Sequence, residues 1–274
     1  MAQDHSHKNY SHTQRKVTGS RGPRTARDLA RRTLSQNFLV DRQAVELLMT
    51  VADPAGVVLE PGAGEGVLTR ALAERGARVT AYEIDPLLAA KLSARTRNEA
   101  GIQVVRGDFT KARAPREPFA VVGNIPYSAT ADIVAWCLNA PALTSATLLT
   151  QREYARKRTG DYGRWSLTTV LHWPWFDWHL RGQVPRTSFR PIPSVDSAVL
   201  RIDRRPIPLV TQRDSYAELV RTGFSGIGGT VRASLRTRYQ GVDAALRDAG
   251  IADDTVVAYV HPEQWVTLHS ALAA

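Results

Sequence analysis

The first segment that can do chemistry is a glycine-rich run framed by carboxylates. Residues 59–66 read Leu-Glu-Pro-Gly-Ala-Gly-Glu-Gly and follow a short β-branched run, so we expect a sharp turn after a strand. Gly62 and Gly64 let a ligand approach the main chain there. A dinucleotide loop reads G-x-G-x-x-G and binds a pyrophosphate, which Glu60 and Glu65 would repel. The segment indicates a cationic nucleotide-like ligand such as S-adenosylmethionine, or else a purely structural turn.

Acidic residues also end the next two expected strands. Glu83 closes a strand expected over 78–84, where a carboxylate accepts hydrogen bonds from ribose hydroxyls. A third strand ends in Gly-Asp-Phe at 107–109. Asp108 can accept from the exocyclic amine of the cofactor's adenine, with Phe109 beside the ring. Because the carboxyl ends of parallel strands meet at one edge, these groups predict a single crevice.

The most informative tetrapeptide is Asn124-Ile125-Pro126-Tyr127, at the end of a fourth expected strand. An adenine amine is a poor nucleophile because its lone pair is delocalised, so it needs acceptors that hold both N–H groups. The Asn124 side-chain carbonyl and the main-chain carbonyl near Ile125 or Pro126 supply two. Pro126 adds no competing N–H, and Tyr127 offers a face to a flipped base. The alternative is a proline turn with a core tyrosine.

The elements that must position these residues alternate along the chain. Strands are expected at 57–59, 78–84, 103–106, 119–122 and 146–150, and helices at 41–51, 66–75, from Pro86 onward and at 130–138. This alternation predicts an α/β fold with a parallel sheet. Segments near 168–180 and 197–203 are expected to finish the sheet as an antiparallel edge.

The pattern changes after Arg204. Helices are expected at 213–223, 230–239, 241–249 and 262–272, without strands of comparable strength. We therefore predict a disordered basic tail over 1–32, a catalytic domain over 33–205 and a helical RNA-binding domain over 206–274.

Charge and composition limit the partners and the compartment. The 274 residues carry 36 Lys and Arg against 26 Asp and Glu, a net charge of +10. This excess favours nucleic acid over a membrane surface, although an Arg-rich, Ala-rich chain also arises from genomic base composition. The first 32 residues supply eight basic and two acidic residues, and form either a phosphate-binding arm or a solubilising tail. A single cysteine, Cys137, excludes internal disulfides and cysteine-ligated zinc and fits the cytoplasm. No apolar run is long enough for a membrane span.

Two basic clusters are candidate RNA contacts. The first follows the fifth expected strand and comprises Arg152, Arg156, Lys157, Arg158 and Arg164. Its alternative is a solvated helix face. Arg232 and Arg236 are four residues apart and share a helix face, where a surface role is equally open. The tryptophans at 165, 173, 175 and 178 are spaced like packing aromatics, and we expect packing rather than base stacking.

Together these motifs resemble the rRNA adenine-N6 methyltransferase family, which comprises KsgA-type dimethylases and Erm-type macrolide-resistance methylases. The family's opening motif matches 35–39 (Ser-Gln-Asn-Phe-Leu), its cofactor loop 60–66 and its catalytic tetrad 124–127. Its F-x-P-x-P-x-V-x-S signature matches 189–197. The resemblance covers about 33–205 closely.

The resemblance implies a Rossmann-like, S-adenosylmethionine-dependent sheet with a small C-terminal helical domain. It adds Phe189 to the tetrad, on the other face of the target base. It adds Gln36, Asn37, Leu39 and Ile84 to the cofactor contacts, and Asn124 is expected to serve both sites. No metal is required, because a sulfonium is already an activated methyl donor.

Within the family the chain is more similar to the Erm branch. Ile125 and Ser128 stand where KsgA-type chains more often carry Leu and Asn, and 151–158 and 161–166 are similar to actinobacterial Erm proteins. Trp165-Ser166-Leu167 departs from some relatives, which carry an extra Arg there. The branch implies a monomer that methylates one adenine in the peptidyl-transferase region of 23S rRNA before full ribosome assembly. This modification blocks macrolide, lincosamide and streptogramin B drugs.

Three alternatives remain. One is a KsgA-like dimethylase of small-subunit rRNA. Another is a non-enzymatic nucleic-acid-binding factor of the same fold. A damaged cofactor loop or tetrad would indicate such a factor, but both motifs are intact in this chain. The third, a DNA adenine methyltransferase, usually carries a second Pro at position 125 and is disfavoured by the 189–197 signature.

Overall fold

The computed structural model describes residues 37–226 and 229–272, which lie within one compact unit, Ser35–Ala274. The predicted tail (1–32) and the predicted cofactor contact Gln36 lie outside the described residues. No helix in the described part of the chain is long and apolar enough to cross a membrane.

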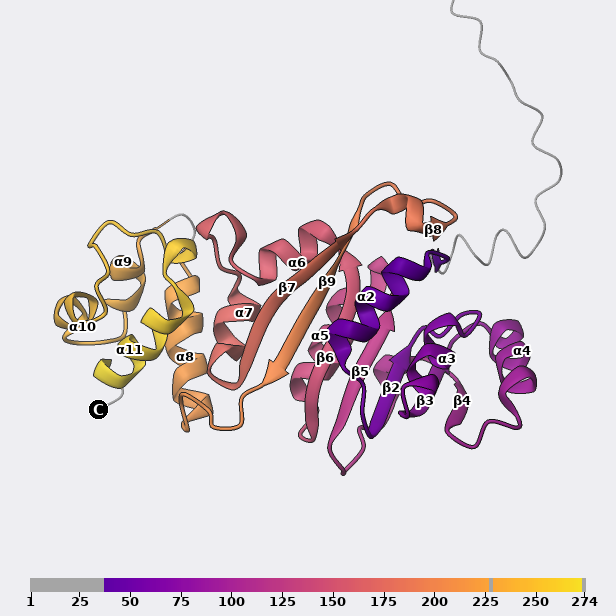
Figure 1. Cartoon of the computed structure of the whole chain (residues 1–274). Helices are drawn as coiled ribbons and strands as arrows, with labels where there is room; N and C mark the ends of the chain where they lie inside the picture. Colours follow the sequence, from indigo (N-terminus) through magenta and orange to yellow (C-terminus); the bar gives the residue numbers. More distant parts are fainter. Residues whose placement is uncertain (1–36, 227–228, 273–274) are drawn as a thin grey trace, which may run out of the picture. The chain divides into compact units, whose positions relative to one another are not determined.

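A seven-stranded sheet runs through the described unit (Figure 1). Its strands, in spatial order, are β4 (Ile102–Arg106), β3 (Arg78–Glu83), β2 (Val57–Pro61), β5 (Phe119–Asn124), β6 (Leu143–Gln151), β9 (Ser197–Arg204) and β7 (Phe176–Val184). The first five are parallel, whereas β9 pairs antiparallel with both β6 and β7. The predicted parallel sheet with an antiparallel edge is therefore confirmed. The chain order reverses between β2 and β5, and ligands of α/β sheets bind at such a switch point.

Both faces of the sheet are buried. Neighbouring residues of one strand, such as Val121 and Val122 or Leu148 and Leu149, belong to two different hydrophobic clusters. Because adjacent side chains of a strand point to opposite faces, each cluster covers one face. This explains why these strands read as continuous apolar runs rather than as alternating ones.

Helices connect the strands and pack on the sheet. They are α2 (Arg42–Ala52), α3 (Val67–Glu74), α4 (Pro86–Thr96), α5 (Thr130–Asn139), α6 (Arg152–Arg158) and α7 (Leu167–His172). Asp41 and Asp85 cap α2 and α4, because their carboxylates accept main-chain N–H bonds from the first helical turn.

One expected edge segment differs. The range 168–180 was expected as strand, but its first part forms α7, and β7 begins only at Phe176. Ser166 accepts the Thr169 N–H and starts the helix, and Pro174 lies in the turn that ends it. The buried side chains of Trp173, Trp175 and Trp178 confirm the packing role expected for them.

The chain ends in four helices: α8 (Arg213–Phe224), α9 (Val231–Leu235), α10 (Val242–Asp248) and α11 (Pro262–Leu272). They surround the fully buried rings of Tyr216 and Trp265. The Tyr216 hydroxyl donates to the Val170 carbonyl at 3.0 Å and so joins α8 to α7. Helix α9 ends four residues before the expected limit of 239.

A second, two-stranded sheet was not foreseen from sequence. Strand β1 (Phe38–Leu39) pairs antiparallel with β8 (Phe189–Arg190), with Leu39 opposite Phe189. The pair joins the opening motif to the 189–197 signature, although the two are about 150 residues apart in sequence.

Candidate active site

The loop after β2 is held against the tetrad after β5. Gly62 and Gly64 have positive φ angles of 71° and 57°, conformations that favour glycine. The N–H groups of Gly62 and Ala63 both donate to the Tyr82 carbonyl at 2.9 Å. A methyl group added to Gly62 would lie 3.5 Å from the Pro126 Cδ. The loop and the tetrad therefore face each other across the switch point.

Two buried carboxyl groups lie around this loop. Glu83 is 2% exposed and accepts main-chain N–H bonds from Gly64 at 2.7 Å and from Asp85 at 2.8 Å. Glu60 is 1% exposed, and its Oε2 accepts the Thr69 hydroxyl at 2.5 Å. Burial raises the pKa of Glu83, and it raises the pKa of Glu60 to about 8.

These carboxyls fit a cationic cofactor, because a nearby positive charge would stabilise their ionised forms. Glu60 nevertheless differs from its expected place. Its carboxyl is enclosed behind the loop, where it is bonded to Thr69 of α3, rather than lining an open crevice. The Glu83 carboxylate accepts the Gly64 N–H and so bonds the end of β3 directly to the loop.

The third strand end is arranged differently from the expectation. Asp108 Oδ1 accepts the Thr110 N–H at 2.9 Å and the Thr110 hydroxyl at 2.8 Å, bonds that lower the pKa of Asp108. Its other oxygen lies 3.9 Å from the Lys111 ammonium and is partly exposed. Phe109 is a core ring, 4.5 Å from the Trp136 ring between centroids, and its place beside the cofactor's adenine stays a prediction.

Two other expected cofactor contacts, Leu39 and Ile84, differ in solvent exposure. Leu39 is buried in the hydrophobic cluster that contains Phe189, so it supports the site from within. Ile84, directly after β3, is 49% exposed and remains available to cover a ligand.

The Asn124 amide is oriented by the opening motif. Its Nδ2 donates to the main-chain carbonyl of Asn37 at 2.8 Å, so the side-chain oxygen is the end left to accept from a ligand. The Pro126 carbonyl accepts the Ala129 N–H at 3.0 Å and the Thr130 hydroxyl at 3.3 Å. These bonds favour the Ile125 carbonyl over that of Pro126 as the second acceptor. Asn37 thus contributes through its main chain, a role that sequence reasoning missed.

Tyr127 is half-buried and anchored by its hydroxyl. The Tyr127 Oη and the Ser197 Oγ share a hydrogen bond of 2.7 Å. Phe189 is 0% exposed in the core cluster. The ring presents no open face in this structure, and its contact with the target base stays a prediction.

The first basic cluster lies on α6 and in the loop after it. Lys157 is exposed and 3.9 Å from Glu153, and Arg152 donates to Gln183 at 3.4 Å. The Arg158 guanidinium lies 4.6 Å from the centre of the Tyr154 ring. Arg156 is paired with Asp161, and Arg164 donates to the Tyr259 hydroxyl at 2.9 Å.

The second cluster is engaged in ion pairs. Arg232 and Arg236 both bind the Asp243 carboxylate, and Arg232 also lies 3.5 Å from Asp253. Their role in RNA binding stays a prediction, and both side chains reach the surface.

Gly123 is a further residue that sequence reasoning missed. A methyl group added there would lie 3.0 Å from both the carbonyl oxygen and the Cδ of Pro61, at the start of the cofactor loop. A glycine inside a strand often marks such a close backbone approach, which was the available signal.

The sheet order, the glycine loop at the switch point and the acceptor pair at the tetrad define a Rossmann-like methyltransferase. The family described as ribosomal RNA adenine dimethylase matches residues 27–274, and the chain belongs to this family.

Named relatives share nearly the whole chain. An rRNA methyltransferase of Streptomyces thermotolerans is 50% identical over 94% of this chain and 89% of its own length. The mycinamicin-resistance protein MyrB of Micromonospora griseorubida is 38% identical over 87% of this chain and 78% of its own length. The crystal structure of the 23S rRNA methyltransferase ErmE superposes with a TM-score of 0.82 at 49% identity, covering 87% of this chain and all of that one.

Proposed function

We propose that the chain transfers a methyl group from S-adenosylmethionine to the N6 amine of one adenine in the peptidyl-transferase region of 23S rRNA. The modification would confer resistance to macrolide, lincosamide and streptogramin B antibiotics. The observation that carries this proposal is the fixed Asn124 amide, whose oxygen is left to accept an amine N–H.

The chemistry of the residues follows from their geometry. The cofactor, when bound, supplies a methyl group on a positively charged sulfur. The glycine loop and Glu83 would hold it, with Glu60 stabilising its charge. Asn124 Oδ1 and the Ile125 carbonyl would accept the two amine hydrogens and aim the lone pair. Tyr127 would stack on the flipped base. Catalysis then rests on positioning and on fixed dipoles.

The large-subunit substrate is favoured over the small-subunit one by two observations. Ile125 and Ser128 follow the Erm pattern in the tetrad region. The structure that superposes at 49% identity is that of a 23S rRNA methyltransferase. We assign methyl transfer to residues 33–205 and RNA contacts to the α6 region and to the helices after 206. The enzyme would act as a monomer in the cytoplasm, on 23S rRNA that is not yet fully assembled.

The test is methyl transfer from labelled S-adenosylmethionine to purified 23S and 16S rRNA. We expect label in 23S rRNA with the wild type, and loss of transfer with retained cofactor binding in Asn124→Ala. Asn139→Ala is a matched control, because Asn139 also donates its amide to a main-chain carbonyl but lies at the exposed end of α5. Label in 16S rRNA alone would identify the small-subunit alternative.

Resistance is tested separately in a macrolide-sensitive bacterium that expresses either protein. We expect the wild-type chain to raise the inhibitory macrolide concentration and Asn124→Ala to leave it at the level of the empty host. Unchanged transfer by Asn124→Ala in vitro would contradict the assigned site.

A further inference from the structure

Two exposed tyrosines near α6 are each paired with a guanidinium. Tyr162 is 66% exposed, and the Arg156 guanidinium lies 4.0 Å from the centre of its ring. Tyr259 is 47% exposed, accepts a hydrogen bond from Arg164 Nε at 2.9 Å and has that guanidinium 5.2 Å from its ring centre. A guanidinium over one face of a ring leaves the other face available for contact.

The exposed Tyr162 has a main-chain conformation that is unfavourable for tyrosine. Tyr162 has a φ angle of 64°, a left-handed conformation that is unfavourable for a bulky residue. The turn is closed by the Gly163 N–H, which donates to the Gly160 carbonyl at 3.0 Å. The Tyr162 N–H donates to Asp161 at 2.9 Å, and Asp161 in turn binds Arg156. Because the ring is not packed in the core, stability does not explain this arrangement.

The two tyrosines belong to segments that are joined to each other. The Trp165 N–H, just after the Tyr162 turn, donates to the Ala258 carbonyl, next to Tyr259, at 2.8 Å. The Trp165 ring also contacts His261, with ring centroids 4.8 Å apart. The segments that carry Tyr162 and Tyr259 are therefore bonded to each other, although 97 positions separate the two tyrosines in sequence.

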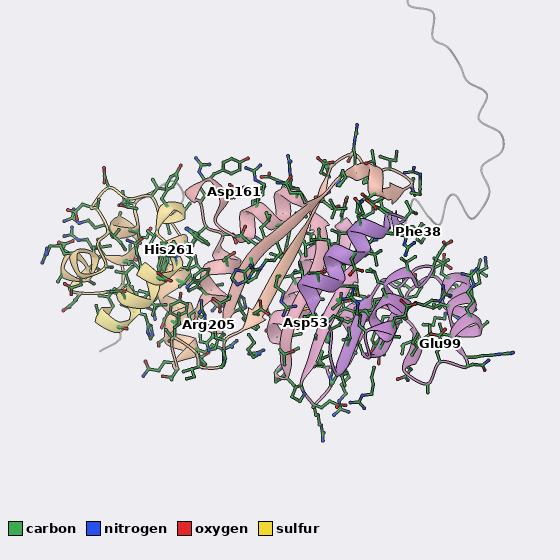
Figure 2. The ribbon with its side chains drawn as sticks, viewed as in Figure 1. Phe38, Asp53, Glu99, Asp161, Arg205 and His261 are labelled. Atoms are coloured by element: carbon green, nitrogen blue, oxygen red, sulfur yellow. The ribbon has the colours of Figure 1, made fainter. Side chains whose placement is uncertain are left out.

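The Tyr162 turn follows the strand that neighbours the tetrad strand β5. Helix α6 has seven residues and leads from β6 to the Tyr162 turn, a span of about 10 Å. Its first N–H, that of Arg152, donates to the carbonyl of Asp196, the residue before Ser197. In Figure 2, Asp161 and Phe38 lie on the upper side of the view, whereas Asp53 and Arg205 lie on the lower side. The Tyr162 turn therefore follows the carboxyl end of β6, which lies at the same edge of the sheet as the tetrad at the end of β5.

We propose that Tyr162 and Tyr259 are stacking platforms for unpaired RNA bases that flank the methylated adenine. The inference rests on the proposed function and extends it to the single-stranded neighbours of the target. The surroundings favour a nucleic acid strand: residues 152–164 contain five Arg or Lys against two Asp or Glu. Aromatic rings among basic groups are the arrangement that binds single strands, because every base has a face to stack and every nucleotide a phosphate.

The decisive variant is Tyr162→Gly. Glycine adopts a φ of 64° without strain, so we expect thermal stability to stay equal or to rise. Affinity for a short unpaired oligoribonucleotide, measured by 2-aminopurine fluorescence, should fall about fivefold or more because one stacking contact is lost. Opposite changes in stability and affinity cannot come from unfolding. Unchanged affinity in Tyr162→Gly would overturn the proposal.

Tyr259 allows a conservative comparison. Tyr259→Phe keeps the ring and should bind nearly as well as the wild type, whereas Tyr259→Ala should lose about fivefold. Ile207→Ala is the matched control, because Ile207 is 81% exposed but stands outside both segments. Arg164→Ala should flatten the salt dependence of binding, whereas the tyrosine variants should leave that slope unchanged. The tyrosine variants should bind an RNA duplex as tightly as the wild type does, and a loss confined to the duplex would contradict stacking.

The outcomes separate the two proposals. A wild-type protein that binds the unpaired strand but does not label 23S rRNA would refute the proposed function alone. A protein that labels 23S rRNA equally well at low RNA concentration with and without both rings would refute the platform alone.

Discussion

The hydroxyl of Tyr127 and the hydroxyl of Ser197 share a hydrogen bond of 2.7 Å and so connect the catalytic tetrad to the last residue of the 189–197 signature. Ser197 is fully buried at the start of β9, where it pairs with Gln151 of β6 and with Val184 of β7. Two strands therefore fix the serine, and the serine fixes the free end of the tyrosine. The signature's last position therefore fixes the Tyr127 ring, on which we propose that the target base stacks.

We expect Tyr127→Phe and Ser197→Ala each to lower kcat/KM about fivefold, because each removes about 1 kcal/mol of orienting hydrogen bond. The double variant should lose little more than either single one, since both changes break the same bond. Methyl-transfer kinetics at varied RNA concentration check this. Ser145→Ala, at the other end of β6, is the matched control for loss of a buried serine. Fully additive losses would show that the bond has no orienting role.

A second prediction concerns Gly123, which lies between the loop and the tetrad. In Gly123→Ala, the added methyl group meets the Pro61 carbonyl at 3.0 Å, so β2 and β5 must move apart slightly. We expect a loss of about 1–3 kcal/mol in unfolding free energy and clearly weaker cofactor binding. Urea unfolding and calorimetric titration measure the two effects.

Gly107→Ala provides the comparison for Gly123→Ala. Gly107 directly follows β4 of the same sheet, and a methyl group there meets nothing within 4 Å. Its replacement should change stability and cofactor affinity little. Similar losses in both variants would mean that the glycines matter through chain flexibility rather than through the contact with Pro61.

The sequence was sufficient to predict features that depend on the order of strands and loops along the chain. Strands at the expected places bring Glu83, Asp108 and Asn124 to one edge of the sheet, because parallel strands present their carboxyl ends together. The glycine loop was predicted for the same reason. Asn37 lies 87 positions from Asn124 and orients it through a main-chain carbonyl. Every residue carries such a carbonyl, so nothing in the sequence indicated this contact.

Burial was the other property that the sequence could not specify. Phe109 and Phe189 stand in motifs beside the active site and were expected to contact ligands, yet both rings fill the core. The residue types of a segment do not show which of its side chains are buried when the segments that pack against it are distant in sequence. The same limit applies to Arg232 and Arg236, whose acidic partner lies on another helix.

That acidic partner, Asp243, supports a third prediction. Bonds from Arg232 and Arg236 lower the pKa of Asp243 to about 2. Because the pKa in the folded protein lies below that in the unfolded chain, the ionised carboxylate stabilises the fold at pH values above the unfolded-state pKa. This contribution is lost as the pH falls toward 2. Asp243→Asn should therefore be less stable than the wild type at pH 5 and should approach it near pH 2. Thermal unfolding of both proteins over this range is the measurement, and a constant difference would contradict the assigned pairing.

The Asp243 variant also tests the RNA role of its two partners. Asp243→Asn removes the carboxylate that Arg232 and Arg236 share without removing their own charges, and Arg232 keeps its contact with Asp253. If these arginines only hold the helices together, RNA affinity should stay unchanged while stability falls, and this is the outcome we expect. A gain in RNA affinity with a steeper salt dependence would instead show that the freed guanidiniums bind phosphates.

The last prediction concerns Glu60, whose pKa is raised by burial to about 8. Between the unfolded value, near 4.5, and 8 the folded protein binds a proton that the unfolded chain does not, so stability should fall as the pH rises through this window. The sign is opposite to that for Asp243. Glu60→Gln should remove this part of the pH dependence and be relatively more stable at pH 8.

The same group should couple cofactor binding to proton release. A bound sulfonium favours the ionised carboxylate, so near pH 7 the wild type should release part of a proton on binding S-adenosylmethionine, and affinity should rise toward pH 8. Calorimetry in buffers of different ionisation enthalpy measures the released protons. Glu60→Gln should release fewer, whereas Glu65→Gln, which removes a carboxylate from the exposed part of the loop, controls for the change in charge. Equal proton release by the wild type and Glu60→Gln would show that Glu60 does not sense the cofactor.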